Sequence, residues 1–363
     1  METRSKRKRT DSARQGHSAT PRPNPTPPLP TDASTDSRSP SPNDHKRRRS
    51  NRPPRPPSTV PSISSVEPAS QNTWQNRKNL AEARIDEYKV AGRPKDDLLA
   101  KTLKAILDYL PEGGRDQLAS DIIGVGDDDP ILWEVFDNFR TGVLEAFKST
   151  TKTFSVTPSP HHNRRASIDK VAAKLPDPQV RSQEWANACL NRDNHRCVIT
   201  GAVTESEWIE QGEVGGQLWG KLEVHHIIPF SLGGFDKKDH HDIAVKWASI
   251  YNAFPAIKKM QASKINMIEN GITLLSQIHS QFQAFKIALQ PTETANFYKV
   301  KKYKSLDPFI FRVIPDDASV TLRQSTGHEN KSLPNRDFLD THFRLCEIWH
   351  ASGMAEEHDR HLY

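Results

Sequence analysis

Two adjacent histidines, His225 and His226, end an apolar, β-prone run that Pro229 then terminates. Neighbouring side chains of an ordinary strand face opposite sides, so one of two consecutive imidazoles would be buried without an obvious partner. A neutral imidazole can accept a proton near neutral pH, and it can also bind a divalent cation. The pair is therefore either tolerated at an exposed strand end or used by a site that needs both rings.

Two further polar residues follow in an order that could complete such a site. Asn270 precedes the apolar run of residues 272–275, and His279 lies early on a predicted helix over Ser276–Gln283. A strand end, a short strand and a helix in this order would bring the three imidazoles together. Taken singly these signals are weak, because a lone histidine is more often structural and an Asn before a strand is usually a turn residue. Taken together they are specific.

The elements around these residues are mixed, which predicts an α+β fold. Apolar periodicity indicates strands at residues 222–230 and 272–275, a helix over residues 240–252, and a hairpin that joins residues 285–289 to 297–300. The remaining expectations are a short strand and turn over residues 196–201 and a helix near residues 338–354.

Composition divides the rest of the chain. Residues 1–75 hold 14 of the 27 prolines, with 14 Lys/Arg against 6 Asp/Glu, which predicts a disordered basic tail. Residues 76–150 carry two apolar stripes at helical spacing, which predict a helical module with a packed core. We expect a linker over residues 151–180, a domain of mixed structure that holds the three histidines over residues 181–305, and a polar C-terminal segment with one helix over residues 306–363.

Whole-chain composition excludes several classes of protein. The 363 residues have a mean hydropathy of -0.73 and 34% hydrophobic residues, as expected for a folded part with polar tails. None of the three cysteines stands in a C-x-x-C pair, which excludes a cysteine zinc framework and a disulfide scaffold. No apolar run approaches the length of a membrane span. The residues after 75 carry 37 Lys/Arg and 39 Asp/Glu, so nucleic-acid binding would depend on local patches.

The tail contains two compact basic clusters, which run from Lys6 to Arg9 and from Lys46 to Arg49. Separated clusters of this kind on a flexible segment are typical of nuclear import signals, so we expect an import receptor as partner and a nuclear location. A tail that only keeps the chain in solution is the alternative.

The histidine pair, Asn270 and His279 together resemble the motif of the HNH endonucleases, which are ββα-metal nucleases. With residues 192–201 and 226–230, the pattern is similar to the HNH nuclease-domain proteins of filamentous fungi. The separation of nine residues between Asn270 and His279 is the usual one in the family. The resemblance covers roughly residues 181–300, and it implies a ββα-metal core.

The resemblance also implies a role for each residue. His226 takes the place of the general base, and Asn270 that of the residue that holds the catalytic loop. His225 and His279 take the places of the metal ligands. The implied activity is hydrolysis of phosphodiester bonds in DNA with a single divalent ion; we expect Mg²⁺, with Mn²⁺ or Zn²⁺ as alternatives.

Two departures from the family keep other functions open. His226 and Asn270 lie 44 residues apart, which predicts an inserted helical segment. Gln283 stands where the fungal proteins tend to have Asp. A catalytically inactive scaffold that binds nucleic acid or protein is therefore the alternative function. A structural zinc domain that uses the three histidines is a third hypothesis.

Contacts to nucleic acid are predicted only coarsely. Three lysine pairs flank the site and could bind phosphates: Lys237 with Lys238, Lys258 with Lys259, and Lys301 with Lys302. A solvated surface is an equally good interpretation of these charges. No segment resembles a base-reading helix or a zinc finger, so we expect little sequence specificity.

Overall fold

The structure is a computed structural model that describes residues 67–148 and 155–360. The two basic clusters and the predicted import function lie outside these residues. The described residues belong to one compact unit, residues 63–363. Its first helix begins at Glu67, inside the residue range predicted for the basic tail. None of the described helices is long and apolar enough to cross a membrane.

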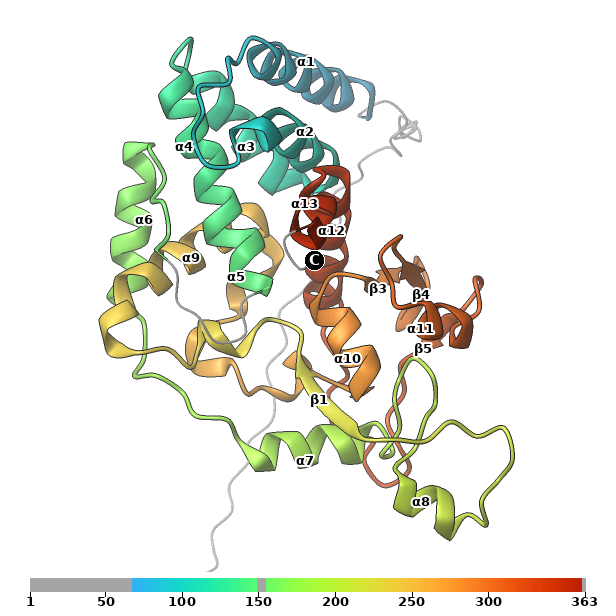
Figure 1. Cartoon of the computed structure of the whole chain (residues 1–363). Helices are drawn as coiled ribbons and strands as arrows, with labels where there is room; N and C mark the ends of the chain where they lie inside the picture. Colours follow the sequence, from blue (N-terminus) through green and yellow to red (C-terminus); the bar gives the residue numbers. More distant parts are fainter. Residues whose placement is uncertain (1–66, 149–154, 361–363) are drawn as a thin grey trace, which may run out of the picture. The chain divides into compact units, whose positions relative to one another are not determined.

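Helices dominate the part before the histidine pair (Figure 1). The described residues there form α1 (Glu67–Asp86), α2 (Leu99–Tyr109), α3 (Glu112–Gly124), α4 (Asp129–Phe139), α5 (Glu145–Lys148), α6 (His162–Ala172), α7 (Gln183–Arg192) and α8 (Glu205–Glu210). A π-helical turn over Arg140–Leu144 joins α4 to α5. The apolar stripes predicted for residues 99–110 and 132–147 are buried, so their interpretation as core is confirmed.

Two small antiparallel sheets complete the α+β fold, which confirms the predicted class. β1 (Leu222–His226) pairs with β2 (Gly271–Leu275), and a second sheet has the order β3 (Ile287–Pro291), β4 (Phe297–Lys302), β5 (Ser319–Thr321). The helices of this half are α9 (His240–Ala253), α10 (Ser276–Gln283), α11 (Pro308–Val313), α12 (Arg336–Ala351) and α13 (Met354–Arg360). The predicted β2, α9, α10, α12 and β3–β4 hairpin are confirmed.

The structure also differs from the sequence expectations at residues 196–201 and in the segment that follows residue 150. Residues 196–201 form a turn and no strand, because the Cys197 N–H donates to the carbonyl of Ala202 and the Gly201 N–H donates back to Cys197, both at 2.8 Å. The predicted linker contains α6, whose only buried residue is Ile168. Ile168 packs on the buried face of α9 at Val245 and Ala248, so tertiary contact stabilises a helix that has little apolar periodicity of its own.

A continuous apolar core joins segments that the sequence analysis predicted as separate parts of the chain. α12 packs on both α2 and β3, and buried residues of the helical part and of the strands belong to one cluster. The segment boundaries drawn from composition stay predictions.

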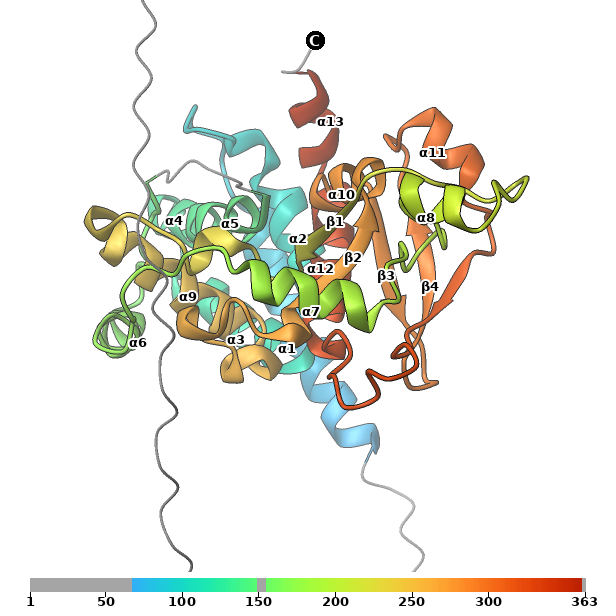
Figure 2. The ribbon, with the colours of Figure 1, turned by 90° about the horizontal axis from the view of Figure 1, so that it is seen from below.

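α7 and a buried ion pair position β2. α7 crosses the β1–β2 pair (Figure 2). Arg192, at its end, is fully buried and pairs with Asp193; its guanidinium donates to the carbonyls of Ile268 and Gly271 at 2.8 Å each. Asp193 in turn accepts from the Thr273 N–H at 3.0 Å. These bonds satisfy charges that would otherwise be costly to bury, and they hold the strand opposite the histidine pair.

Candidate active site

The three predicted imidazoles line one pocket. This pocket, called here the histidine pocket, has a volume of about 100 Å³. Its lining comes from α5, the segment before α7, β1 with the turn that follows it, and α10: Phe147, Arg181, Val224, His225, His226, Pro229, Phe230, Ser231, His279 and Gln283. The order strand end, strand, helix therefore brings the rings together as the sequence predicted.

The end of β1 explains how two consecutive histidines reach the same pocket. His225 and His226 are the last residues of the strand and lie opposite Ile272 and Gly271. After His226 the chain leaves the strand path and passes through Pro229 into the short 3₁₀ helix η3 (Phe230–Leu232). Strict alternation to opposite faces applies to regular strand, so it no longer separates the two rings where the strand ends.

Asn270 holds this turn in place. Its side chain is fully buried. Oδ1 accepts from the Ile228 N–H at 2.7 Å, and Nδ2 donates to the carbonyls of Ile228 (3.0 Å) and Ile265 (2.9 Å). Its backbone carbonyl accepts from the Ile227 N–H at 2.9 Å. An amide is suited to this position because it can donate and accept at once, which an aspartate cannot.

His226 is only 5% exposed and is enclosed by aromatic rings. Its ring stacks on Trp185 of α7, with centroids 3.7 Å apart. Gly271 makes this approach possible, because a Cβ there would lie 2.3 Å from Cys189 Sγ and 2.9 Å from Trp185 Cζ2. Burial lowers the pKa of His226 from 6.5 to about 4, the hydrogen bond with Asn266 opposes the shift, and the Arg181 charge adds to it. His226 is therefore neutral at physiological pH.

The hydrogen bonds of His226 define which of its nitrogens can act as a base. Nε2 lies 3.0 Å from Asn266 Oδ1, and the same amide donates through Nδ2 to the carbonyl of Val180 at 2.9 Å. This second bond sets the orientation of the Asn266 amide, so that Oδ1 faces the imidazole. Because Oδ1 can only accept a hydrogen bond, Nε2 of His226 must carry the proton. Nδ1 is then unprotonated and can accept a proton.

His225 and His279 form a second pair of rings, beside His226. Their ring centroids lie 4.6 Å apart. Burial is the main cause that lowers the pKa of His225 well below 6.5, and the neighbouring His279 lowers it further. His279 Nδ1 lies 2.5 Å from Oε2 of Glu223, whose pKa is lowered by hydrogen bonds from Lys221 and from His279. The carboxylate therefore holds the proton on Nδ1, so in the neutral imidazole of His279 the lone pair lies on Nε2.

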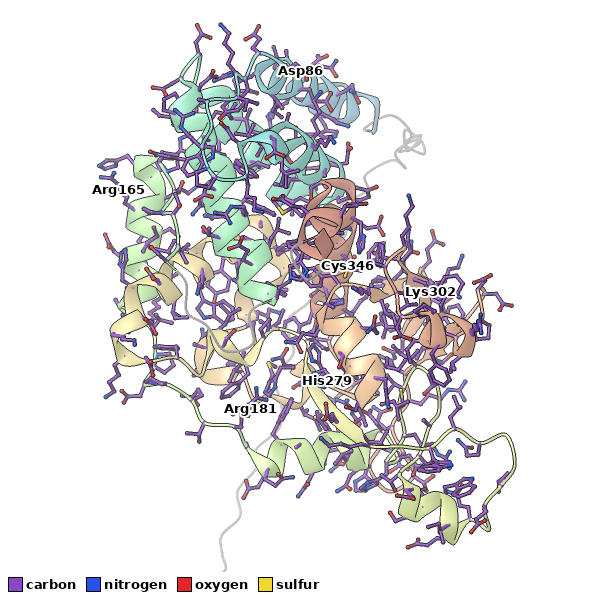
Figure 3. The ribbon with its side chains drawn as sticks, viewed as in Figure 1. Asp86, Arg165, Arg181, His279, Lys302 and Cys346 are labelled. Carbon is purple, nitrogen blue, oxygen red and sulfur yellow. The ribbon has the colours of Figure 1, made fainter. Side chains whose placement is uncertain are left out.

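Arg181 supplies positive charge to the histidine pocket (Figure 3). Its guanidinium carbon lies 4.8 Å from the centroid of the Phe230 ring, which in turn lies 5.3 Å from that of His226. Arg181 has no hydrogen bond or ion pair to any described residue. A guanidinium in this position is available to an anionic group that enters the pocket.

Comparison with known proteins identifies the family of this region. Residues 197–290 match the family model described as HNH endonuclease, and the match includes the three imidazoles and Asn270. This segment therefore matches the HNH endonuclease family, and it is called the HNH domain below. No curated protein and no solved structure matches the chain. Arg181 and Trp185 lie before the matched residues, so the pocket of the HNH domain is completed by the preceding segment.

The donor set of the HNH domain fits a divalent ion. His225 is neutral, and the Nδ1 of His279 is held by a carboxylate, which is the usual support of a histidine that binds metal. Within the described part of the chain, no three His, Cys, Asp or Glu side chains are grouped closely enough to hold an ion by themselves. Two imidazoles would thus leave most coordination positions to water and phosphate oxygens, as in a catalytic site.

The other predicted residues differ in whether they line the histidine pocket. Gln283 lines the histidine pocket, so the departure from the fungal pattern falls in the site itself. Lys237 and Lys238 are exposed and pair with Asp177 (3.3 Å) and Asp236 (3.5 Å) outside the pocket. Lys258 lines a second cavity, between α6 and α9, whereas Lys259 is exposed and lines neither cavity.

Sequence reasoning missed the residues that surround the imidazoles. Glu223 could have been found, because it lies two residues before His225 on a strand and so shares its face. Arg181, Trp185 and Asn266 gave no such signal. They lie about 40 residues from the histidine pair, and only the packing of α7 and of the segment before β2 brings them to it.

Proposed function

We propose that the HNH domain hydrolyses phosphodiester bonds in DNA, with His226 as general base and a divalent ion held by His225 and His279. The observation that supports this most strongly is the histidine pocket itself. It combines a neutral imidazole, a carboxylate-supported imidazole and a guanidinium that has no ion pair with a described residue, all in one cavity of about 100 Å³.

His226 would activate the attacking water. Its Nδ1 takes a proton from water as the oxygen forms a bond to phosphorus, and the bond from phosphorus to the departing oxygen breaks. A general base must be unprotonated at working pH, and the low pKa of His226 meets this requirement. The stack on Trp185 and the bond to Asn266 fix the ring, so little orientational freedom is lost in the reaction.

The remaining residues of the pocket address the phosphate. Arg181 would bind its non-bridging oxygens and offset the charge that develops there. The ion held by His225 and His279 would supply Lewis-acid charge relief to a phosphate oxygen and to the departing oxygen. Imidazole donors suit Zn²⁺, whereas Mg²⁺ and Mn²⁺ would depend on phosphate and water oxygens for most of their ligands.

A plasmid assay tests this proposal. The full chain is incubated with supercoiled DNA, and in parallel with RNA, in the presence of Mg²⁺, Mn²⁺ or Zn²⁺. We expect metal-dependent nicking of DNA, and we expect His226→Ala to reduce the rate by at least about 10²-fold, because general base catalysis typically contributes 10² to 10⁴.

His241→Ala is the matched control, because His241 is exposed at the start of α9 and lies outside the pocket. Circular dichroism of both variants would confirm that the fold persists. Undiminished cleavage by His226→Ala would refute the assignment of the base. Absence of cleavage by the wild type with every ion, together with absence of divalent binding in calorimetry, would refute the nuclease proposal.

A further inference from the structure

A second cavity, larger than the histidine pocket, lies between α6 and α9. Its volume is about 200 Å³, and we call it the α6–α9 cavity. The lining comes from α6, the segment after it, α9, and the 3₁₀ helix η5 (Pro255–Lys259) with the residues that follow: Ser167, Lys170, Val171, Lys174, Leu175, Pro176, Trp247, Tyr251, Lys258, Gln261 and Ala262. The predicted mechanism uses none of these residues.

The charge of the α6–α9 cavity has one sign. Lys170, Lys174 and Lys258 line it, all three are exposed, and no carboxylate is part of the lining. None of the three ammonium groups has an ion pair or a hydrogen bond to a described residue. Lys237 and Lys238 differ in this respect, because each pairs with an aspartate. Three unpaired cations around one cavity repel each other, and an anion would relieve this repulsion.

The floor of the cavity is aromatic, and its polar atoms are already satisfied. The Trp247 Nε1–H donates to the carbonyl of Leu232 at 2.9 Å, and the Tyr251 hydroxyl donates to the carbonyl of Met260 at 2.6 Å. The two ring centroids lie 5.2 Å apart. Trp247 is fully buried and Tyr251 is partly exposed, so it is the Tyr251 ring that offers apolar surface to the cavity while the lysines surround it. This combination is typical of sites that hold the phosphate and the sugar or base of a nucleotide.

Two connections link the α6–α9 cavity to the histidine pocket. Leu232, which Trp247 contacts, follows Ser231 directly, and Ser231 lines the histidine pocket. The segment from Lys174 to Arg181 also runs from one cavity to the other, and the Gln179 N–H holds it against Gly233 with a bond of 2.8 Å. A strand that extends from the scissile phosphate along this segment would meet the three lysines.

We propose that the α6–α9 cavity binds a phosphate group, with its nucleoside, of the nucleic-acid strand outside the scissile position. This inference rests on the proposed function, because it assumes that the strand occupies the histidine pocket. It assigns to α6, which lies before the matched family segment, a role in substrate binding. The contact is to the phosphate backbone, so it adds affinity without base specificity.

The test compares two triple variants of the full chain, both in the His226→Ala background so that bound DNA stays intact. Lys170→Gln/Lys174→Gln/Lys258→Gln removes the charge of the cavity. Lys101→Gln/Lys299→Gln/Lys304→Gln removes the same charge from exposed positions outside both cavities. Fluorescence anisotropy with a short DNA duplex gives Kd over a range of salt concentrations.

We expect the cavity variant to bind DNA about tenfold more weakly and to lower the slope of log K against log salt by about one, as for the loss of a phosphate contact. The control variant should change Kd less than about threefold. With His226 restored, the cavity variant should show a higher KM and an unchanged kcat, because the lysines do not touch the reacting atoms.

Equal Kd values and equal salt slopes for the two triple variants would overturn this inference, and DNA cleavage by the wild type would still support the nuclease proposal. If the wild type cleaves no DNA with any ion but the cavity variant still binds DNA more weakly than the control variant, the nuclease proposal is wrong and the binding role of the cavity stands. A separate titration with inorganic phosphate distinguishes a free anion from a strand. If phosphate binds the wild type but not the cavity variant, and DNA affinity is the same for both, the site holds a free phosphate and the strand proposal is wrong.

Discussion

His342 tests how a buried side chain that packs against α10 stabilises the site. It lies on α12, is 2% exposed, and stacks on Phe282 with ring centroids 3.7 Å apart. Its Nε2–H donates to the carbonyl of Phe282 at 3.0 Å. Phe282 also contacts the His225 ring edge-on, with centroids 5.3 Å apart. His342 therefore supports α10 and, through Phe282, the pair of rings that would hold the ion.

The pKa of His342 sets the size of the expected effect. Burial lowers the pKa of His342 from 6.5 to about 3. Between these two values the unfolded chain binds a proton that the folded chain does not, so the free energy of unfolding falls as the pH falls. From about pH 7.5 to about pH 5 this single group should cost about 2 kcal/mol of stability, and the loss should continue down to about pH 3.

His342→Gln removes the titrating group while it keeps an amide that can donate to the Phe282 carbonyl. The variant should be less stable at neutral pH because the stack is lost. Its stability difference between about pH 7.5 and pH 5 should be smaller than that of the wild type by about 2 kcal/mol. Urea unfolding followed by tryptophan fluorescence measures this difference, and the same exchange at exposed His241 controls for the loss of one histidine.

The result that would refute the reasoning is an equal pH dependence of stability in the wild type and in His342→Gln. A direct readout is the NMR shift of the His342 ring, which should remain that of neutral imidazole down to about pH 5. Titration of this ring near 6.5 would show that it is not buried as described.

Two further predictions concern the histidine pocket itself. Glu223→Gln removes the carboxylate that holds His279, so Mn²⁺ affinity measured by calorimetry should fall about 10- to 100-fold, while Lys221→Gln should change it far less; equal affinities would contradict the supporting role of Glu223. Gly271→Ala would push a Cβ into Cys189 Sγ and Trp185. The free energy of unfolding should therefore fall by about 1–3 kcal/mol, seen as a lower urea midpoint, and cleavage should weaken. An unchanged midpoint would argue against the close approach at Gly271.

Local pattern was sufficient for several elements of the site. Apolar runs and the residues that end them predicted β2 and the limits of α10, and the order of these elements predicted that His225, His226 and His279 converge. At residues 196–201 the turn was predicted but the strand was wrong, and the helix α6 was not predicted, because a packed but polar helix has a weak local signal.

The sequence by itself determined which groups could do chemistry and in what order they occur. Imidazole, amide and spacing are properties of the chain, and they indicated the HNH family. Only the tertiary structure decided the state of these groups. The pKa of His226 depends on burial against Trp185 and on the charge of Arg181, and the tautomer of His279 depends on Glu223. Desolvation and hydrogen bonding act through space, so residues far apart in sequence set the proton affinity of each ring.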